Sequence, residues 1–345
     1  MKKILLTGSE GFIGSHLTEK LLTNNYDVKC LVLYNSFNNI GNLQFLPKKL
    51  LENCEIIFGD IRDQDLMRKI SKGCNTIINL AALIGIPYSY SAVRSYIDVN
   101  VIGTHNLLQC AMMNNVEKFI HTSTSEVYGT AQYVPIDEKH PNVGQSPYSA
   151  SKISADALVT SFNRSFDLNT LTIRPFNTFG PRQSNRAIIP TIVSQFMTEK
   201  KLTLGNIKPK RDLTYVEDTA QAYLDALKIK KKFKGKIVNL GTGQSFSVLE
   251  IIKIISKFYK KELRITQDKA RFRPKNSEVF NLVASNVEAK KFLNWKPKFI
   301  GKKGLEKGII KTIEFLHENK IDKIDNTMTG FTKRLNLFAS ISPIL

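Results

Sequence analysis

Apolar runs of strand length alternate with longer amphipathic stretches of helical period through the first half of the chain. The apolar runs lie at residues 3–8, 28–33, 55–60, 75–82, 118–125 and 168–177, and the first helical pattern lies near 12–24. Continuous apolar strands separated by helices are typical of a parallel sheet that is covered on both faces. The pattern therefore predicts an α/β fold built on a doubly wound, Rossmann-like parallel sheet.

The rhythm changes near residue 178, where shorter segments containing Pro and Arg begin. We expect residues 1–178 to form a dinucleotide-binding domain whose sheet is completed by part of 210–243. Residues 179–318 are expected to form mostly a smaller C-terminal substrate-binding lobe. The remaining tail, 319–345, shows no pattern that predicts a role.

The composition is that of a globular protein with a sizeable core, since 42% of the 345 residues are hydrophobic. No apolar run approaches the ~20 residues that span a bilayer. The apolar start of the chain breaks off at Thr7, too early for a secretory signal. We therefore expect a cytoplasmic protein with no membrane partner. The four cysteines form no CxxC pair, which favours reduced thiols over a metal or redox site.

The formal net charge of +20 raises the question of nucleic acid as a partner. Most basic residues are lysines spread along the chain, with one dense run at 228–236, and we find no accompanying nucleic-acid-binding motif. The charge fits an acidic small-molecule substrate equally well. Charge alone decides nothing, but without a motif we expect no nucleic acid.

The segment TGSEGFIG carries a glycine pattern between the first strand and the first helix. Gly8 permits a tight turn, Gly11 lets the backbone approach a pyrophosphate at the positive helix N-terminus, and Gly14 allows close packing of helix on strand. Together with the intervening Phe12 and Ile13, these glycines predict a bound dinucleotide.

The acidic residue that usually binds the ribose diol is missing, because the second strand ends CLVLYNSFN with neither Asp nor Arg. NAD is favoured since no arginine is placed for a 2′-phosphate, and NADP stays open. After the third strand, Asp60 and Ile61 are candidates near the adenine, although an N-cap role explains Asp60 equally well. Ala81 and Ala82, in the NLAA turn, complete the predicted cofactor site.

The motif YSASK places Tyr148 and Lys152 on one face of a helix. An ammonium group beside a phenol favours the phenolate, so Tyr148 is a candidate base near neutral pH. The preceding strand ends in hydroxyl residues that include Thr124. Two residues later, Glu126 lies on the same face as Thr124 if the chain stays extended. An unpaired buried carboxylate is costly, which argues for a specific role.

Six motifs follow one another in the order TGxxGFIG, NLAA (79–82), Ser/Thr-x-Glu-Val-Tyr-Gly, YxxxK, RPFNTFGPRQ (174–183) and RDLTYVED (211–218). Over about residues 1–316 the chain resembles the extended short-chain dehydrogenase/reductase family of NAD-dependent epimerases and dehydratases. The resemblance implies a nucleotide-linked sugar as substrate, oxidised at C4 of the hexose by a bound nicotinamide.

Within that family, Thr124-Ser125-Glu126 resembles the triplet of the GDP-mannose 4,6-dehydratase type. The dTDP-glucose dehydratases carry Thr-Asp-Glu, so Ser125 departs from that branch. The phrases LIGIPYSY, QYVPIDEKHP and GQSPYSASK look most like nucleotide-activated N-acetylglucosamine 4,6-dehydratases of the legionaminic acid pathway. This predicts a dehydratase of GDP- or UDP-N-acetylglucosamine. A UDP-glucuronate decarboxylase, which shares the Thr-Ser-Glu triplet, a 4-epimerase and a non-catalytic nucleotide sensor are the alternatives.

The resemblance also implies roles for individual residues. Tyr148 would remove the O4 proton. Lys152 would keep the Tyr148 phenol ionised, and Thr124 would orient O4. Glu126 would take the C5 proton and deliver it to O6, with Ser125 or a water assisting. The implied substrate-binding residues are Asn177, Arg186, Arg211 and Arg273, with Arg182 as a weaker candidate. Helical stretches near 100–113 and 148–163 resemble a four-helix dimer interface, which implies a homodimer or homotetramer.

Overall fold

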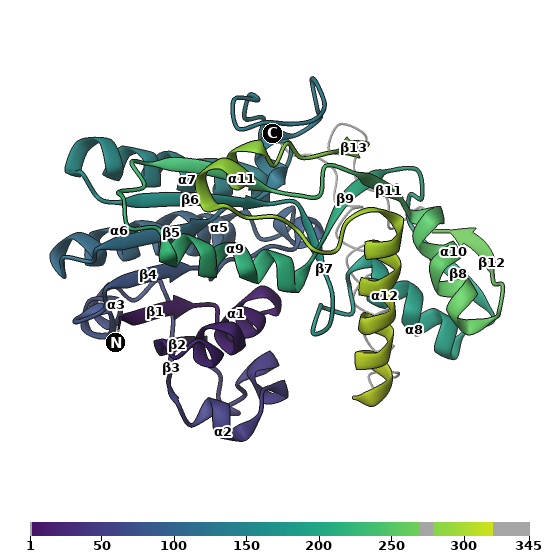
Figure 1. Ribbon diagram of the computed structural model, residues 1–345, viewed down its shortest axis with the longest axis horizontal. Helices are drawn as coiled ribbons and strands as arrows, with labels where there is room; N and C mark the ends of the chain where they lie inside the picture. Colours follow the sequence, from purple (N-terminus) through teal and green to yellow (C-terminus); the bar gives the residue numbers. More distant parts are fainter. Residues whose placement is uncertain (1, 269–278, 320–345) are drawn as a thin grey trace, which may run out of the picture.

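The computed structural model describes residues 2–268 and 279–319. Arg273 and all but the first residue of the 319–345 tail lie outside these residues. Figure 1 shows a large sheet flanked by helices and, beside it, a smaller lobe.

The large sheet has seven parallel strands in the order β10-β6-β5-β4-β1-β2-β3. Its strands are β1 (Lys3–Thr7), β2 (Asp27–Leu33), β3 (Cys54–Gly59), β4 (Thr76–Asn79), β5 (Lys118–Thr122), β6 (Thr170–Pro175) and β10 (Lys236–Leu240). The strand order reverses between β1 and β4, which is the point where such sheets bind ligands at their C-terminal edge. The predicted doubly wound α/β fold is confirmed.

Helices cover both faces of this sheet because its strands are apolar on both sides. On β1, Ile4 and Leu6 belong to one buried cluster with Leu17 and Tyr223, whereas the intervening Leu5 belongs to another. The helices around the large sheet are α1 (Phe12–Thr23), α3 (Gln64–Ser71), α6 (Gly103–Met113), α7 (Pro147–Phe166), α9 (Val216–Lys228) and α11 (Val287–Leu293).

Short helical segments lie in the connections of the first half. They are η1 (Gly41–Phe45), α2 (Lys48–Leu51), α4 (Ile86–Ser89), α5 (Val93–Tyr96), the π-helix η2 (Ile97–Ile102) and the 3₁₀-helix η3 (Ser125–Tyr128).

The smaller lobe has a core of its own, with Phe196, Leu202 and Ile255 among its buried residues. Its strands are β7 (Asn177–Phe179), β8 (Lys201–Leu204), β9 (Lys210–Tyr215), β11 (Ser245–Ser247), β12 (Arg264–Gln267) and β13 (Asn281–Leu282), and its helices are α8 (Ile188–Thr198), α10 (Val248–Tyr259) and α12 (Gly301–Glu318). Within the 210–243 segment, β10 joins the large sheet, whereas β9 pairs with β7, β11 and β13.

The apolar run at 118–125 does not stay extended to its end, and this corrects one prediction. Strand β5 stops at Thr122, and Ser125–Tyr128 forms the 3₁₀-helix η3. The cause is local: the Thr124 hydroxyl accepts a hydrogen bond from the Glu126 backbone N–H at 3.2 Å and caps the turn. The argument that placed Glu126 on one extended strand face with Thr124 is therefore wrong.

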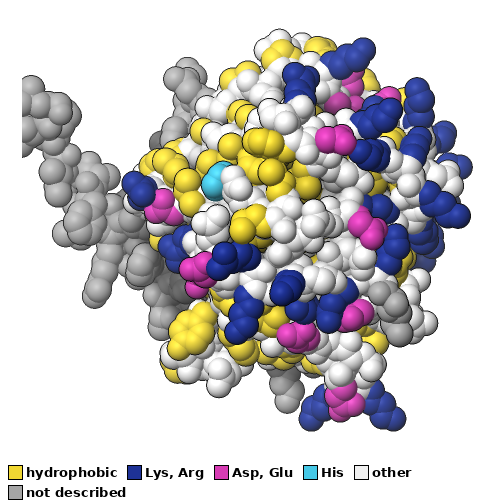
Figure 2. All heavy atoms as spheres, turned by 90° about the vertical axis from the view of Figure 1, so that its left-hand side faces the viewer, with side chains coloured by type: hydrophobic (Ala, Val, Ile, Leu, Met, Phe, Trp, Pro, Cys, Tyr) yellow, Lys and Arg dark blue, Asp and Glu magenta, His cyan; other side chains and the backbone are white. Residues whose placement is uncertain are grey.

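Figure 2 shows how the charged residues are distributed over one face of the molecule. Lysine and arginine side chains gather along the right-hand side of this view, with scattered acidic side chains between them. Among residues 2–268 and 279–319, no helix combines the length and apolar character needed to cross a lipid bilayer.

Candidate active site

The glycine loop has the shape that a dinucleotide needs. Gly8 has φ +66°, and a Cβ there would lie 2.8 Å from the backbone nitrogen of Ala81, in the turn after β4. A Cβ on Gly14 would overlap the carbonyl oxygen of Gly8. Gly11 is the N-cap of helix α1 and provides no side-chain cap, so the first N–H groups of the helix have no side-chain acceptor there. This backbone cradle fits a pyrophosphate.

The other predicted cofactor residues are buried to different extents. Phe12 and Ile13 are half-buried and pack against the lobe core. Ile61 is buried against the first turn of α6, where a Cβ on Gly103 would overlap it. Ala82 follows Ala81 in the half-buried turn after β4.

Asp60, predicted to lie near the adenine or to cap the next helix, pairs with Arg62. Its Oδ2 accepts hydrogen bonds from Nε and Nη2 of Arg62 at 3.0 and 2.6 Å, and these bonds lower the Asp60 pKa. The N-cap of α3 is Asp63, so the alternative interpretation of Asp60 as this cap is wrong.

Helix α7 starts immediately before the YSASK motif and fixes its orientation. Ser146 and Ser149 form a reciprocal capping box, and Pro147 occupies the first turn. Four residues apart, Tyr148 and Lys152 both face inward and are buried. The Lys152 ammonium group donates a hydrogen bond to the carbonyl oxygen of Thr122 at 2.7 Å, at the end of β5.

The electrostatics of this pair differ from the expectation that Lys152 would lower the Tyr148 pKa. Burial raises the pKa of Tyr148, the hydrogen bond with Thr124 opposes that rise, and the charge of Glu126 adds to it. Burial lowers the pKa of Lys152 to about 8, against an opposing effect of Asp156. The chain by itself therefore favours the neutral phenol.

The turn after β5 brings the other predicted catalytic residues to the same place. Thr124 and Ser125 are buried, and Glu126 is half-buried. The contribution of Glu126 to the Tyr148 pKa shows that its carboxylate lies within electrostatic reach of the phenol. The 3₁₀ turn thus gathers Thr124, Glu126 and Tyr148 by a route other than strand alternation.

Sequence reasoning missed a buried ionic network directly beneath these residues. Asp156, one helical turn beyond Lys152, accepts hydrogen bonds at Oδ2 from Ser123 at 2.8 Å and from Nε and Nη2 of Arg174 at 3.0 and 2.9 Å. His121 Nε2 lies 3.4 Å from its other oxygen. Burial opposes ionisation of Asp156, but His121 and Arg174 outweigh it and hold the Asp156 pKa below its usual value.

The network continues to the turn that carries Glu126. Arg174 also donates to the Tyr128 hydroxyl at 2.9 Å and lies over its ring, and that hydroxyl donates to Asn239 on β10 at 2.7 Å. Arg174 therefore joins α7 to η3. The sequence signals were Asp156 in register with Lys152 and an arginine inside the apolar strand LTIRPF.

The predicted substrate-binding residues fall into three groups. Asn177, on β7, has a buried side-chain oxygen without a hydrogen-bond partner in the described part of the chain. Strand β7 pairs with β9, which carries the half-buried Arg211. Arg186 is exposed beside α8. Arg273 lies outside the described residues.

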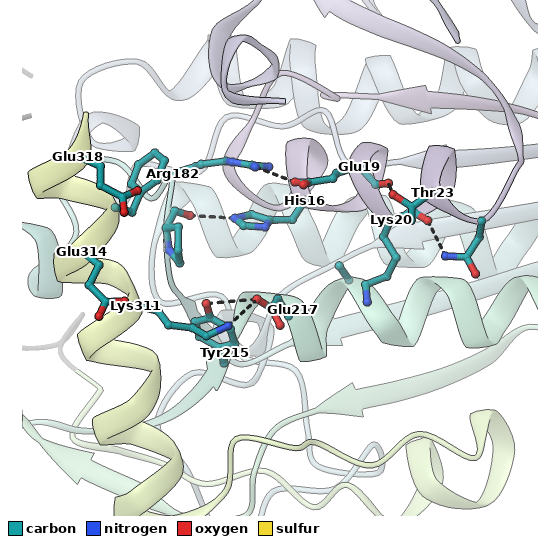
Figure 3. A pocket seen from close by; sticks show the side chains of 14 residues that line it. His16, Glu19, Lys20, Thr23, Arg182, Tyr215, Glu217, Lys311, Glu314 and Glu318 are labelled. Carbon is teal, nitrogen blue, oxygen red and sulfur yellow. Dashed lines mark hydrogen bonds and ion pairs between the residues drawn. The ribbon is translucent and has the colours of Figure 1, made fainter. Parts of the chain in front are cut away.

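Arg182 faces a different cavity, shown in Figure 3. This cavity of ≈ 570 Å³ lies between α1, α9 and α12. Arg182 Nη2 bonds to Glu19 at 2.6 Å, and His16 Nε2 lies 3.0 Å from the carbonyl oxygen of Pro181. Of the two lysines in this wall, Lys311 pairs with Glu217 at 3.3 Å and Lys20 donates to the Gln221 side-chain oxygen at 3.0 Å. The cavity is lined from the sheet side by α1 and α9 and from the lobe by α12, and Tyr148 is not among its lining residues.

The family model described as GDP-mannose 4,6 dehydratase matches residues 5–308. This match covers most of the chain, which therefore belongs to this family of nucleotide-sugar dehydratases and epimerases. The fold, the glycine cradle and the Tyr148–Lys152 helix described above are consistent with that membership.

Particular relatives show the breadth of the family. A putative UDP-glucose 4-epimerase of Methanocaldococcus jannaschii is 33% identical, over 92% of this chain and 99% of its own. The human dTDP-D-glucose 4,6-dehydratase is 30% identical, over 92% and 91%. The structure of DesIV, a dTDP-glucose 4,6-dehydratase from Streptomyces venezuelae with NAD bound, is 26% identical with a TM-score of 0.82, covering 92% of this chain and 98% of DesIV.

Proposed function

We propose that the protein is an NAD-dependent 4,6-dehydratase of a nucleotide-activated N-acetylglucosamine, with GDP or UDP as the nucleotide. The observation that carries this proposal is the Glu126 carboxylate within electrostatic reach of Tyr148, on a turn capped by Thr124. C4 oxidation needs one base, and removal of the C5 proton needs a second. Tyr148 and Glu126 are the proposed first and second base.

The first step is deprotonation of O4. Tyr148 takes this proton, and Thr124, whose hydroxyl already bonds the phenol, orients O4. Lys152 stays close as a buried ammonium group, held at the end of β5 by the Thr122 carbonyl. The Gly8–Gly14 cradle would hold NAD, which when bound would supply the hydride acceptor and donor for this chemistry and a positive ring that favours the phenolate.

The second step is elimination of water across C5 and C6. The new C4 ketone acidifies the C5 hydrogen, which Glu126 then removes. Ser125 is a poor acid, so Glu126 delivers the same proton to the departing O6, assisted by Ser125 or a water. The O4 proton passes from Tyr148 to solvent, and a solvent proton delivered through Glu126 is added to C5 when the hydride returns to C6. A single carboxylate thereby serves as base and then as acid.

Substrate binding is proposed for Asn177 and Arg211, with Arg186 and Arg273 as further candidates. The unpartnered side-chain oxygen of Asn177 suits a donor on the ligand, and an arginine fork suits diphosphate oxygens. Beside Tyr148, Ile86 and Tyr96 form a small apolar cluster with the loop after NLAA. This apolar wall favours an N-acetyl group over a plain hydroxyl.

A panel of nucleotide sugars tests the proposal. GDP- or UDP-N-acetylglucosamine is expected to give a 4-keto-6-deoxy product, lighter by one water in mass spectrometry, with a higher kcat/KM than the plain nucleotide-glucose. The Tyr148→Phe variant should give no product. Carbon dioxide from UDP-glucuronate would instead identify a decarboxylase.

The 4-epimerase alternative is favoured by the 33% identity with a putative UDP-glucose 4-epimerase and by the likeness to solved 4-epimerases, such as the UDP-glucuronic acid 4-epimerase of Bacillus cereus at 28% identity and a TM-score of 0.83. An epimerase needs no second acid–base group, which leaves Glu126 unexplained. The same panel separates the two, since epimerisation changes the sugar configuration without changing its mass.

We also propose a homodimer formed by the helices η2, α6 and α7. Ile97, Ile102, Met113 and Phe166 are exposed apolar residues on or beside these helices. Light scattering during size-exclusion chromatography is expected to give about twice the 39.0 kDa mass of the chain, or four times if dimers pair. A monomer at micromolar concentration would contradict this assembly.

A further inference from the structure

The end of β2 lacks the side chain that normally binds the adenosine ribose in this fold. An acidic residue after the second strand usually accepts a hydrogen bond from the ribose 2′-hydroxyl. Here the strand ends in Leu33 and Tyr34, which are 57% and 69% exposed. A dinucleotide in the Gly8–Gly14 cradle would therefore meet apolar side chains at this point.

The asparagines that follow are engaged in shaping their own loop. The Asn35 amide nitrogen donates to the carbonyl oxygens of Leu33 and Asn39 at 3.2 and 2.9 Å, and its oxygen accepts from the Asn39 N–H at 2.8 Å. The Asn39 side-chain oxygen accepts from the Gly41 N–H at 2.7 Å. These bonds make the turn and leave the ribose position without a charged acceptor.

A carboxylate reaches the end of β2 from the glycine loop itself. Glu10, between Gly8 and Gly11, accepts a hydrogen bond at Oε1 from the Leu33 N–H at 2.9 Å. Its own carbonyl oxygen accepts from the Asn42 N–H at 2.9 Å. Gly41, with φ +57°, packs so closely that a Cβ there would lie 2.9 Å from the Glu10 side chain. The loop thus holds Glu10 in place at both backbone and side chain.

The second oxygen of this carboxylate has no donor. Glu10 Oε2 is buried and makes no hydrogen bond within residues 2–268 and 279–319. Burial raises the pKa of Glu10, and the bond from Leu33 opposes the rise. An unsatisfied buried carboxylate oxygen costs free energy that a donor would recover.

We infer that Glu10 replaces the missing acidic residue of β2, accepting a hydrogen bond from the 2′-hydroxyl of the adenosine ribose and so selecting NAD over NADP. In NADP the same position carries a phosphate, which has no hydrogen to donate at neutral pH and is repelled by a carboxylate. The ligand hydroxyl would supply the donor that Oε2 lacks.

Arg62 follows β3, the strand that pairs with β2, and this cation is engaged elsewhere. Its Nε and Nη2 both bond to Asp60, and its backbone N–H bonds to the other Asp60 oxygen at 2.9 Å. A 2′-phosphate would have to displace Asp60 to reach it. Asp60 and Glu10 thus both disfavour binding of the 2′-phosphate of NADP.

Binding of three ligands to the full chain, without any sugar substrate, tests this inference. Isothermal titration calorimetry gives the Kd of NAD⁺, NADP⁺ and 2′-deoxy-NAD⁺ for the wild type and for Glu10→Gln. Glutamine still accepts from Leu33 but loses the charge. We expect the wild type to bind NAD⁺ at least tenfold more tightly than either analogue, as a charge-assisted hydrogen bond implies. In Glu10→Gln, NAD⁺ should weaken about tenfold and match 2′-deoxy-NAD⁺.

Glu52→Gln is the matched control, since Glu52 is exposed at the end of α2. It should leave all three Kd values within twofold of wild type. Equal melting temperatures of the three proteins would exclude a folding defect. The inference is overturned if Glu10→Gln keeps the wild-type ratio of NAD⁺ to 2′-deoxy-NAD⁺ affinity. It also fails if the wild type binds NADP⁺ as tightly as NAD⁺.

Discussion

Replacing Glu126 by glutamine is expected to abolish the 4-keto-6-deoxy product while C4 oxidation continues. A general base contributes about 10²- to 10⁴-fold to the step it serves, so the rate of product formation should fall by about three orders of magnitude. The amide keeps the size of the side chain but cannot take the C5 proton. Reduced nicotinamide should therefore accumulate on mixing with substrate, and its absorbance is measured alongside product by mass spectrometry.

The pH dependence of C4 oxidation gives a second measurement on the Glu126→Gln variant. The charge of Glu126 raises the pKa of Tyr148, so glutamine should lower that pKa. The rate of C4 oxidation would then reach its plateau at lower pH than in the wild type. A carboxylate that lay away from the phenol would leave this profile unchanged.

Glu117→Gln is the matched control, because Glu117 lies just before β5 and pairs with Lys2 at the surface. It should keep wild-type turnover. Ser125→Ala is expected to slow elimination less than Glu126→Gln, since a water can replace the hydroxyl. Product formation at near wild-type rate by Glu126→Gln would remove Glu126 from the mechanism.

The large sheet could be predicted because its signals are local. Each buried strand is a short apolar run, and the glycines at 8, 11 and 14 mark the turn from β1 to α1. These features need no knowledge of distant residues. The seventh strand, β10, lies within the segment 210–243 that was expected to complete the sheet, and it too is a short run of mostly apolar residues.

The exit from β5 could not be predicted by the same reasoning. Alternation along a strand predicts a shared face for Thr124 and Glu126 only while the chain stays extended. The hydroxyl of Thr124 competes for the Glu126 N–H and starts a 3₁₀ turn. The Glu126 carboxylate still comes within electrostatic reach of Tyr148. Glu126 therefore lies near the phenol as expected, although the backbone conformation that places it there was predicted wrongly.

The ionisation of the site depends on burial, which sequence spacing does not reveal. Four-residue spacing placed Tyr148 and Lys152 on one face, but it could not show that both are fully enclosed. Enclosure raises the pKa of the phenol and lowers that of the ammonium group to about 8. The partner of Asp156 was equally hidden, because Arg174 lies on a separate strand that only the folded sheet brings alongside.

Replacing Asp156 by asparagine is expected to destabilise the protein by about 3–5 kcal/mol, the usual cost of leaving a buried charge without its partner. Two bonds from Arg174 end on Asp156 Oδ2, and the same carboxylate supports the buried ammonium group of Lys152. Urea titration, followed by circular dichroism and by fluorescence of the buried Trp295, measures the change in the free energy of unfolding.

The surface pair Asp65–Arg68 provides the matched control for Asp156→Asn. Its side chains are 90% and 56% exposed, so Asp65→Asn should change the free energy of unfolding by less than about 1 kcal/mol.

Replacing both Asp156 and Arg174, by Asn and Met, should cost less than the sum of the single changes, because neither charge is then left unpaired. Equal effects of Asp156→Asn and Asp65→Asn would mean that water or other groups already satisfy Arg174. In that case the network would not be what holds the Glu126 turn against the Tyr148 helix.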